Sequence, residues 1–371
     1  MSVTLTLPAV IWLIMLISVI MIAYMTDSGV LSERDLALVE VLQTDPRASW
    51  AVVARVMNTS PVTAARRWRR LVDKGEAWVT GAPGVSVWNA QCVAYVDIRC
   101  SPGQSLAVAE TLAQDRHALS VELTAGGSDI FVTAAAADLR ALSRYLLNRV
   151  EMIPGITDTR TRISTHLYRD GSHWRLGALP RKDSSVTPGQ SHSRDATRPQ
   201  LLPHLQSVDR AILVQLGLDG RSSYTRLAAS AKISEATVRR RVARLLDGGA
   251  VLLRAEVAAY PAGWPVPVIL SVDVPTNGLV ETARGIAQLR QVRLCATLAG
   301  TPPMLVSAWL RDVDAIHDFE SNLVKAVPNI TVVDRLITLR TVKRMGRLLD
   351  EDGRAVAVVP MDIWTDPLSM A

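Results

Sequence analysis

The sequence is poor in the residues on which most enzymes and metal sites depend. Its 371 residues include three cysteines, six histidines and two phenylalanines. Cys92 and Cys100 are expected on one strand, where eight residues span about 26 Å, too far for a disulfide; unpaired cysteines fit a reducing compartment. The histidines lack metal-ligand spacing, and no Ser/His/Asp, Cys/His or paired-carboxylate pattern is present. We therefore predict no catalytic residue, no metal and no cofactor.

The first 26 residues lack charge altogether, and residues 11–25 are almost continuously apolar. This length approaches what a membrane span needs, but no Lys or Arg precedes it, as a signal peptide would require. Three interpretations stay open. Translation starting at Met25 is favoured over a membrane anchor at residues 7–25, and a buried apolar arm is the third. Membrane attachment is therefore an open question.

An internal repeat organises the rest of the chain. With Asp35 aligned to Asp209, residues 35–78 and 209–252 share 15 of 44 positions without a gap, at an offset of 174. The offset still aligns Gly126 with Gly300 and Pro154 with Pro328. A whole module has been duplicated.

Each module combines two kinds of pattern. Residues 31–80 and 205–254 predict three short helices, whereas residues 91–168 and 265–341 predict the strand–helix–strand–strand–helix–strand order of a ferredoxin-like domain, with Asp138 and Asp312 as helix N-caps. The fold class is therefore α+β. The predicted units are an apolar segment (1–26), a helix-turn-helix domain (27–84), a ferredoxin-like domain (91–168), a Pro/Ser-rich linker (178–204), a second helix-turn-helix domain (205–259), a second ferredoxin-like domain (265–341) and a C-terminal tail (342–371).

The third helix of each triplet carries a cationic face. Ser60 and Ser234 are natural N-caps, and Ala64, Trp68 and Leu71 recur at the spacing of a buried face. A different face of each helix repeats Thr and Arg at i, i+3, i+4 and i+7, with no acidic residue on that face. A tight turn followed by such a helix is the geometry that enters a major groove, where arginine binds guanine or phosphate. The predicted DNA-binding residues are Ser60, Thr63, Arg66, Arg67, Arg70, Ser234, Thr237, Arg240, Arg241 and Arg244.

With these motifs the chain resembles the Lrp/AsnC (feast/famine) transcription regulators. The shared pattern is Asp-x6-Leu…Arg-x-Ser-x4-Ala…Ser-x-x-Thr-x-x-Arg-Arg-x-x-Arg-Leu-x-x-x-Gly, at 35–75 and again at 209–249. The resemblance implies two winged-type helix-turn-helix domains, each followed by a domain that dimerises through its sheet and binds an amino acid or small metabolite. The usual family protein has half this length, so one chain is expected to supply both halves of a dimer, or to form a homo-oligomer.

The resemblance also places an effector site at a Gly-x-x-Asp turn between the middle strands. Gly126, Gly127 and Asp129 match it in the first copy; in the second, Gly300 is followed by Thr-Pro-Pro, so proline replaces the acid. A carboxylate binds an ammonium group and proline cannot. Effector binding is therefore less expected in the second copy, and a plain β-turn remains the alternative for the first.

Three functions share this architecture. The favoured one is a cytoplasmic, nucleoid-associated transcriptional regulator that binds double-stranded DNA, with which a net charge of +6 is compatible. The second is a tetrapyrrole (sirohaem) decarboxylase-like enzyme, because the chain resembles such enzymes in its double architecture. Those enzymes carry an Arg- and His-containing stretch after the wing, whereas residues 79–91 and 261–268 of this chain contain neither Arg nor His. The third is a nucleoid-type architectural DNA binder. Because the two recognition helices differ at Trp68 and Val242, the first hypothesis predicts unequal half-sites.

Overall fold

The computed structural model of the chain describes residues 30–179 and 205–369. The apolar segment 1–26 and residues 180–204 of the predicted linker lie outside these ranges, and so does the question of a membrane anchor. Within the described ranges, no helix is both long and apolar enough to cross a membrane.

Each copy begins with three helices and a strand. In the first copy they are α2 (Glu33–Thr44), α3 (Trp50–Val56), α4 (Pro61–Asp73) and β1 (Ala77–Pro83), and the short helix α5 (Val85–Trp88) follows. In the second they are α8 (Ser207–Leu218), α9 (Tyr224–Ala231), α10 (Glu235–Asp247) and β6 (Val251–Val257). The turns before α4 and α10 share one conformation, since Asn58 and Lys232 both have positive φ, at 46° and 55°. The predicted helix-turn-helix units are confirmed.

The ferredoxin-like parts follow in the predicted order. The first contains β2 (Cys92–Cys100), α6 (Ser105–Ala113), β3 (Ala118–Ala125), β4 (Ile130–Ala136), α7 (Leu139–Tyr145) with a π-helical turn η1 (Leu146–Val150), β5 (Ile156–Arg169) and a 3-10 turn η2 (Gly171–His173). The second contains β7 (Val266–Asp273), a 3-10 turn η3 (Thr276–Gly278), α11 (Leu279–Ala287), β8 (Val292–Ala299), β9 (Met304–Leu310), α12 (Ala315–Ala326) and β10 (Thr331–Arg344). Cys92 and Cys100 lie on one strand, and both are free thiols, as predicted.

Two local expectations were wrong. Asp138 does cap α7, but the N-cap of α12 is Asp314, and the Asp312 carboxylate instead accepts a hydrogen bond from the Ala315 N–H at 2.8 Å. The predicted domain end at residue 341 falls inside β10, which continues to Arg344. After it, β11 (Arg347–Leu349) and β12 (Ala355–Val358) form two further strands within the predicted C-terminal tail.

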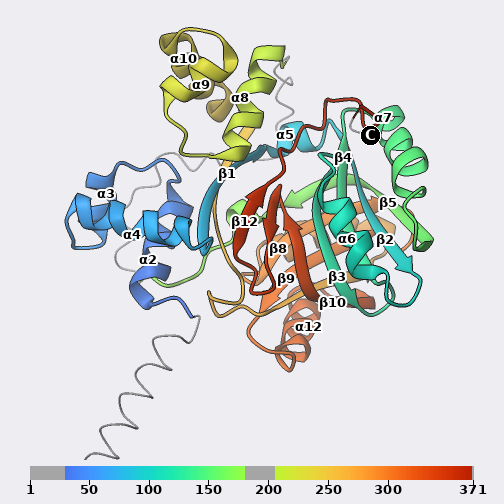
Figure 1. Cartoon of the computed structure of the whole chain (residues 1–371). Helices are drawn as coiled ribbons and strands as arrows, with labels where there is room; N and C mark the ends of the chain where they lie inside the picture. Colours follow the sequence, from blue (N-terminus) through green and yellow to red (C-terminus); the bar gives the residue numbers. More distant parts are fainter. Residues whose placement is uncertain (1–29, 180–204, 370–371) are drawn as a thin grey trace, which may run out of the picture.

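The two ferredoxin-like sheets close into one antiparallel barrel. The first half of β5 pairs with β2 and its second half with β8 of the other copy. In the same way, β10 pairs with β7 and then with β3. The ring therefore runs β10–β3–β4–β2–β5–β8–β9–β7 and returns to β10, with β11 and β12 continuing from β10. One chain thus supplies both halves of a two-fold arrangement (Figure 1).

Alternation along the barrel strands separates two layers of apolar side chains. On β2, Ala94, Val96 and Ile98 point outward and pack with α6, whereas Val93 and Tyr95 belong to the cluster inside the barrel. This is the period of two expected for a strand buried on both faces. The helices α11 and α12 cover the second sheet in the same way.

The helix-turn-helix units exchange strands across the two copies. The expected wing is a ribbon made by β1 and β6, one strand from each copy, with Thr80 opposite Arg254 at its centre. Val87 of the first copy packs into the core of the second helix-turn-helix unit, whereas Ala255 and Val257 of the second copy pack into the core of the first. In Figure 1, the ribbon strand β1 lies between the barrel and the two groups of helices.

Candidate nucleic-acid interface and barrel interior

The recognition helix α4 begins at a well-formed cap. The Ser60 hydroxyl accepts the Thr63 N–H at 3.1 Å and contacts the Thr63 hydroxyl at 2.8 Å, with Pro61 at the first helical position. The buried face consists of Ala64, Trp68 and Leu71, as predicted. Ser234 and Thr237 repeat this cap on α10, at 3.3 Å and 2.9 Å. Both helix N-termini present free backbone donors where a phosphate can bind.

Some arginines of the predicted DNA-binding faces are already engaged by an acidic residue of the protein itself. Arg67 and Arg70 each place a guanidinium nitrogen on the Asp35 carboxylate of α2, at 2.8 Å and 2.7 Å. Burial raises the pKa of Asp35, but hydrogen bonds from Ser32, Arg67 and Arg70 outweigh it and hold the pKa below its usual value. The interpretation that the cationic face has no compensating acid was therefore wrong: the acid comes from another helix.

The second copy repeats this arrangement. Asp209 of α8 has no exposed surface, and its carboxylate is contacted by Arg241 at 2.9 Å and by Arg244 at 3.0 Å. Arg241 also donates to the Gln206 side chain. The repeat aligns Asp35 with Asp209, and this identity indicated that the acid is needed without indicating which arginines it contacts.

Arg66 and Arg240 are the arginines of the predicted set that stay unpaired. Both are exposed, and no acidic group of the described residues lies within ion-pair distance of either. Of the predicted set, each described module therefore presents one arginine without an acidic partner, two arginines tethered to an acid, and a capped N-terminus. A guanidinium that is not engaged by a protein carboxylate can give both of its donor edges to a base or a phosphate.

The two interfaces differ at the first residue of the recognition helix. Pro61 begins α4, but Glu235 begins α10 and accepts hydrogen bonds from Arg239 at 2.6 Å and Thr225 at 2.9 Å. The hydrogen bond from Arg239, whose guanidinium also stacks on Tyr224, lowers the pKa of Glu235. The helix N-terminus that would bind a phosphate thus carries a fixed negative charge in the second copy alone.

Replacing Glu235 by glutamine is therefore expected to raise DNA affinity. Removing a negative charge beside a DNA phosphate favours binding by about threefold at low salt, and by less as salt screens the charge. Mobility-shift titrations at two salt concentrations measure the change. Glu281→Gln on α11 removes the same charge from the ferredoxin-like domain and serves as the control. An equal gain in both variants would contradict a local effect at α10.

A reciprocal arginine clamp joins the two helix-turn-helix units. Arg47 donates to the carbonyl oxygens of Gly220 and Ser222 at 2.8 Å and 2.9 Å. Arg221 donates to those of Pro46 and Ala48 at 2.7 Å and 3.0 Å. Each guanidinium also stacks on an aromatic ring of the other unit, Tyr224 for the first and Trp50 for the second. The repeat aligns Arg47 with Arg221, but it did not indicate that they bridge the copies.

Loss of this clamp is expected to free the two units from one another. Arg47→Ala combined with Arg221→Ala leaves four carbonyl groups without these donors, which lowers the free energy of unfolding by about 2–4 kcal/mol. Affinity for a site that engages both units should fall by about tenfold, with affinity for a half-site unchanged. Thermal unfolding and mobility shifts on whole and half sites test this. Equal losses on both sites would contradict it.

The predicted effector turn lies at the junction of the copies. A Cβ atom on Gly126, which has φ 137°, would lie 2.5 Å from the Arg335 carbonyl oxygen of β10. Asp129 does not point away from the fold, because its carboxylate accepts the Cys100 N–H at 2.7 Å. At the equivalent turn, Gly300 has φ 108° and open space beside it. The Asp129 carboxylate thus ties the turn to the end of β2, and its effector role stays a prediction.

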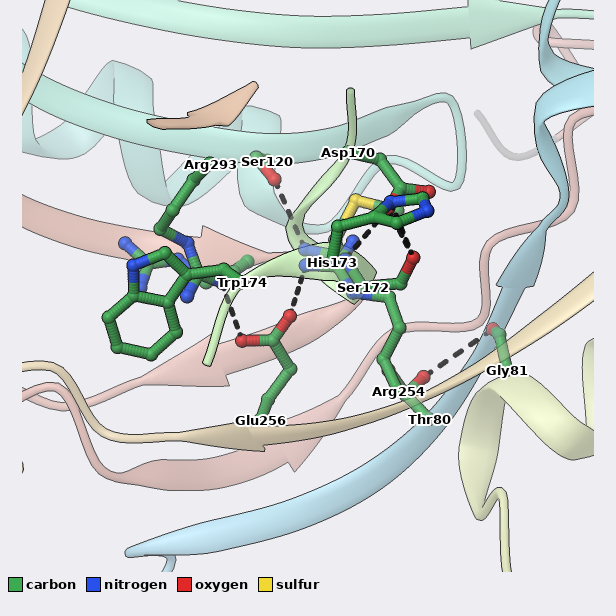
Figure 2. A network of polar contacts seen from close by, with 12 residues as sticks. Thr80, Gly81, Ser120, Asp170, Ser172, His173, Trp174, Arg254, Glu256 and Arg293 are labelled. Atoms are coloured by element: carbon green, nitrogen blue, oxygen red, sulfur yellow. Dashed lines mark hydrogen bonds and ion pairs between the residues drawn. The ribbon is translucent and has the colours of Figure 1, made fainter. Parts of the chain in front are cut away.

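Buried charged residues lie where the β1–β6 ribbon meets the barrel, and the sequence did not predict them. Glu256 of β6 lies between two guanidinium groups, bonding Arg254 on one side and Arg293 at 2.8 Å on the other (Figure 2). Arg293 lies over the Trp309 ring, 3.7 Å from its centroid, and Arg344 lies 4.6 Å from the same ring. Alternating strand patterns do not show which polar residues a closed barrel will bury.

Nearby, Asp170, Ser172 and His173 come together, although no such triad was expected. All three belong to one tight turn: Asp170 caps the 3-10 turn and bonds the Ser172 N–H at 2.7 Å, while His173 Nδ1 lies 3.4 Å from the Asp170 carboxylate. The same imidazole nitrogen also lies 3.4 Å from the Ser172 hydroxyl, whereas the histidine of a catalytic triad uses one nitrogen for the acid and the other for the serine. Figure 2 shows this group above the Glu256 pair.

Family models match both kinds of domain twice. The AsnC-type helix-turn-helix domain matches residues 31–72 and 205–246, and the Lrp/AsnC ligand binding domain matches residues 93–173 and 268–348. The chain belongs to the Lrp/AsnC family of helix-turn-helix transcriptional regulators. Its curated relatives include an uncharacterised HTH-type transcriptional regulator of Pyrococcus horikoshii, 30% identical over 143 residues that cover 38% of this chain and 90% of the relative. LrpA of the same organism is 28% identical over 136 residues, 36% of this chain and 96% of LrpA.

This Lrp/AsnC protein thus has about twice the length of those relatives. Among solved structures, the siroheme decarboxylase NirDL has a TM-score of 0.52 and 13% identity, with 87% of this chain and 96% of that one covered. At that identity the similarity concerns the fold: both chains share the double architecture. The single-module relatives are those whose names give a regulatory function.

Proposed function

We propose that this Lrp/AsnC protein is a transcriptional regulator that binds double-stranded DNA with both recognition helices of a single chain. The observation that carries the proposal is the repeated arrangement of an N-terminal cap and an unpaired arginine, Arg66 on α4 and Arg240 on α10. Ser60, Thr63, Ser234 and Thr237 would position phosphates. The tethered arginines Arg67, Arg70, Arg241 and Arg244 would add positive charge to the same surfaces.

The proposal includes an asymmetric operator. Trp68 and Arg69 of α4 are replaced by Val242 and Ala243 in α10, and Glu235 replaces Pro61. The two helices should therefore prefer different half-sites. Footprinting on genomic fragments captured by the purified protein, started at Met25 and used at two salt concentrations, tests this. A perfectly palindromic footprint would contradict a pseudo-dimer that reads two unequal half-sites.

A nucleoid-type architectural role is the nearest alternative, because it uses the same residues. The ratio of specific to non-specific affinity distinguishes the two. A regulator should bind its captured site at least about 1,000-fold more tightly than competitor DNA. A ratio near one would favour the architectural role. Either protein would act in the cytoplasm on the nucleoid.

We also propose that the turn containing Gly126, Gly127 and Asp129 senses an amino acid or a similar small metabolite, with Gly300 marking the altered second copy. The match of the Lrp/AsnC ligand binding model to both copies supports this. The closed barrel supports an intramolecular pseudo-dimer, and further oligomerisation of whole chains would follow the family. Titration of amino acids into the protein–DNA complex tests the sensing role.

We propose further that the protein is not an enzyme. The double architecture shared with a siroheme decarboxylase is the observation in favour of the alternative. Against it, residues 79–91 and 261–268 contain no His and no Arg. Incubating the pure protein with sirohaem and following its absorption spectrum tests the alternative directly. A spectral change that requires the protein and yields a decarboxylated product would overturn the regulatory proposal.

A further inference from the structure

The barrel interior contains a half-open cavity of about 100 Å³. Strands of both copies line it, together with the β1–β6 ribbon and helix α5. One part of the wall is apolar and aromatic, and another part contains three arginines. The lining includes Trp88, Tyr95, Phe131, Arg254, Arg293 and Arg344. None of them belongs to the recognition helices or to the predicted effector turn.

Three polar groups of the cavity wall have no hydrogen-bond partner among the described residues. They are the Trp88 indole N–H, the Tyr95 hydroxyl and the Arg254 Nε–H. Their residues are 7%, 0% and 8% exposed. A buried donor without a partner costs about 1–3 kcal/mol, and such groups mark sites where a partner binds. All three can donate, so the partner they fit must offer acceptor atoms.

The duplication supplies an internal control for the charged groups. At the offset of 174, Arg254, Glu256 and Arg293 correspond to Thr80, Ala82 and Leu119, and strand pairing follows the same offset throughout the barrel. The first copy thus folds with small or apolar residues where the second copy buries three charges. Because a buried ion triad stabilises a fold no better than apolar side chains of similar size do, packing does not explain the charges.

The local charges define the kind of ligand. Each carboxylate at the cavity is already engaged. Glu256 bonds Arg254 and Arg293. Of the two carboxylates that line the cavity, Asp170 accepts the Ser172 N–H, and Glu122 lies 3.4 Å from the Arg344 guanidinium. An ammonium group would meet guanidinium groups and few free acceptors, whereas a carboxylate would meet donors on several sides. The cavity volume limits the size of the ligand, since an apolar cavity of about 150 Å³ holds benzene. The cavity here thus suits a carboxylate of a few carbon atoms.

We infer that the barrel interior is a binding site for a small carboxylate without an amino group, separate from the effector turn. Arg293 and Arg344 would bind the carboxylate above the Trp309 ring. Tyr95 and Trp88 would donate to a second oxygen, and Phe131 would pack against the carbon atoms. A short oxo acid has this combination of groups.

Isothermal titration calorimetry of the full chain with pyruvate tests the inference, with alanine and inorganic phosphate as comparison probes. Pyruvate should bind one site per chain. Alanine, which replaces the keto oxygen with an ammonium group, should bind at least tenfold more weakly. Absence of pyruvate binding at millimolar concentration would overturn the inference, as would equal binding of alanine or tighter binding of phosphate.

Two variants locate the site. The triple variant Arg254→Thr, Glu256→Ala and Arg293→Leu gives the second copy the residues of the first, and it should fold but lose pyruvate binding by at least 100-fold. Tyr95→Phe removes a hydroxyl with no intramolecular partner, so it should fold in any case and weaken pyruvate binding about tenfold. Unchanged affinity in Tyr95→Phe would overturn the inference, even if the triple variant failed to fold.

Discussion

Replacing Arg66 and Arg240 together by alanine is expected to abolish specific DNA binding while the protein stays folded. Each bidentate arginine–guanine contact contributes about 1–3 kcal/mol, so the loss of two weakens binding by about 100-fold or more. Both side chains are exposed and, within the described chain, neither pairs with an acid, so their removal leaves no buried group without a partner. Mobility-shift titration at physiological salt measures the loss, and thermal unfolding confirms the fold.

A matched control removes the same charge elsewhere. Arg140 on α7 and Arg284 on α11 are exposed arginines of the ferredoxin-like domains, and their double replacement by alanine should leave specific affinity unchanged. Arg241→Ala, unlike these variants, should lower the free energy of unfolding, because Asp209 is fully buried and would lose a partner. Retained operator affinity in the Arg66/Arg240 variant would contradict the assignment of α4 and α10 as the helices that contact the DNA bases.

Glu256→Ala alone is expected to destabilise the protein severely. The residue is 2% exposed and separates two arginines that are themselves 8% and 7% exposed, so its loss leaves two buried like charges facing each other. Breaking a buried ion pair in this way costs about 3–5 kcal/mol. Urea unfolding of wild type and variant measures the cost.

The triple variant that copies Thr80, Ala82 and Leu119 into the second half is the comparison. It removes all three charges at once, so its free energy of unfolding should equal or exceed that of the wild type.

Burial raises the pKa of Glu256, but Arg254, Arg293 and Arg344 outweigh it and lower the pKa. A carboxyl with a depressed pKa stabilises the fold above its unfolded pKa and loses that contribution as pH falls through the folded value. The triple variant should therefore gain relative to wild type on acidification. A Glu256→Ala variant as stable as the triple variant would contradict this account.

Local signals in the sequence were enough to predict the helix-turn-helix units. The caps Ser60 and Ser234 and the spacing of Ala64, Trp68 and Leu71 act within one or two helical turns, so no distant residue was needed to interpret them. The same holds for the alternating strands and for the order of the ferredoxin-like domains. The duplication added a second copy of every signal, and this is why the recognition faces stood out.

Contacts between residues that are distant in sequence could not be predicted in this way. The Asp35 and Asp209 partners of the tethered arginines lie 32 or more residues away in sequence, and the pattern of α4 alone could not reveal them. The repeat did align Arg47 with Arg221, and Asp35 with Asp209. An identity between copies indicates that a residue is needed, but it does not indicate which residue it contacts.

The sequence by itself determined that this protein is two copies of one module, a helix-turn-helix unit followed by a ferredoxin-like unit, because repeat, cap and periodicity are properties of neighbouring residues. Only the tertiary structure decided that the copies exchange strands, close one barrel and bury Arg254 and Glu256 of the β1–β6 ribbon against Arg293 of the barrel. An alternating strand can pair along either edge with any strand of matching pattern, so its partners depend on how the whole chain closes. The barrel cavity and its unpaired donors exist only because of that closure.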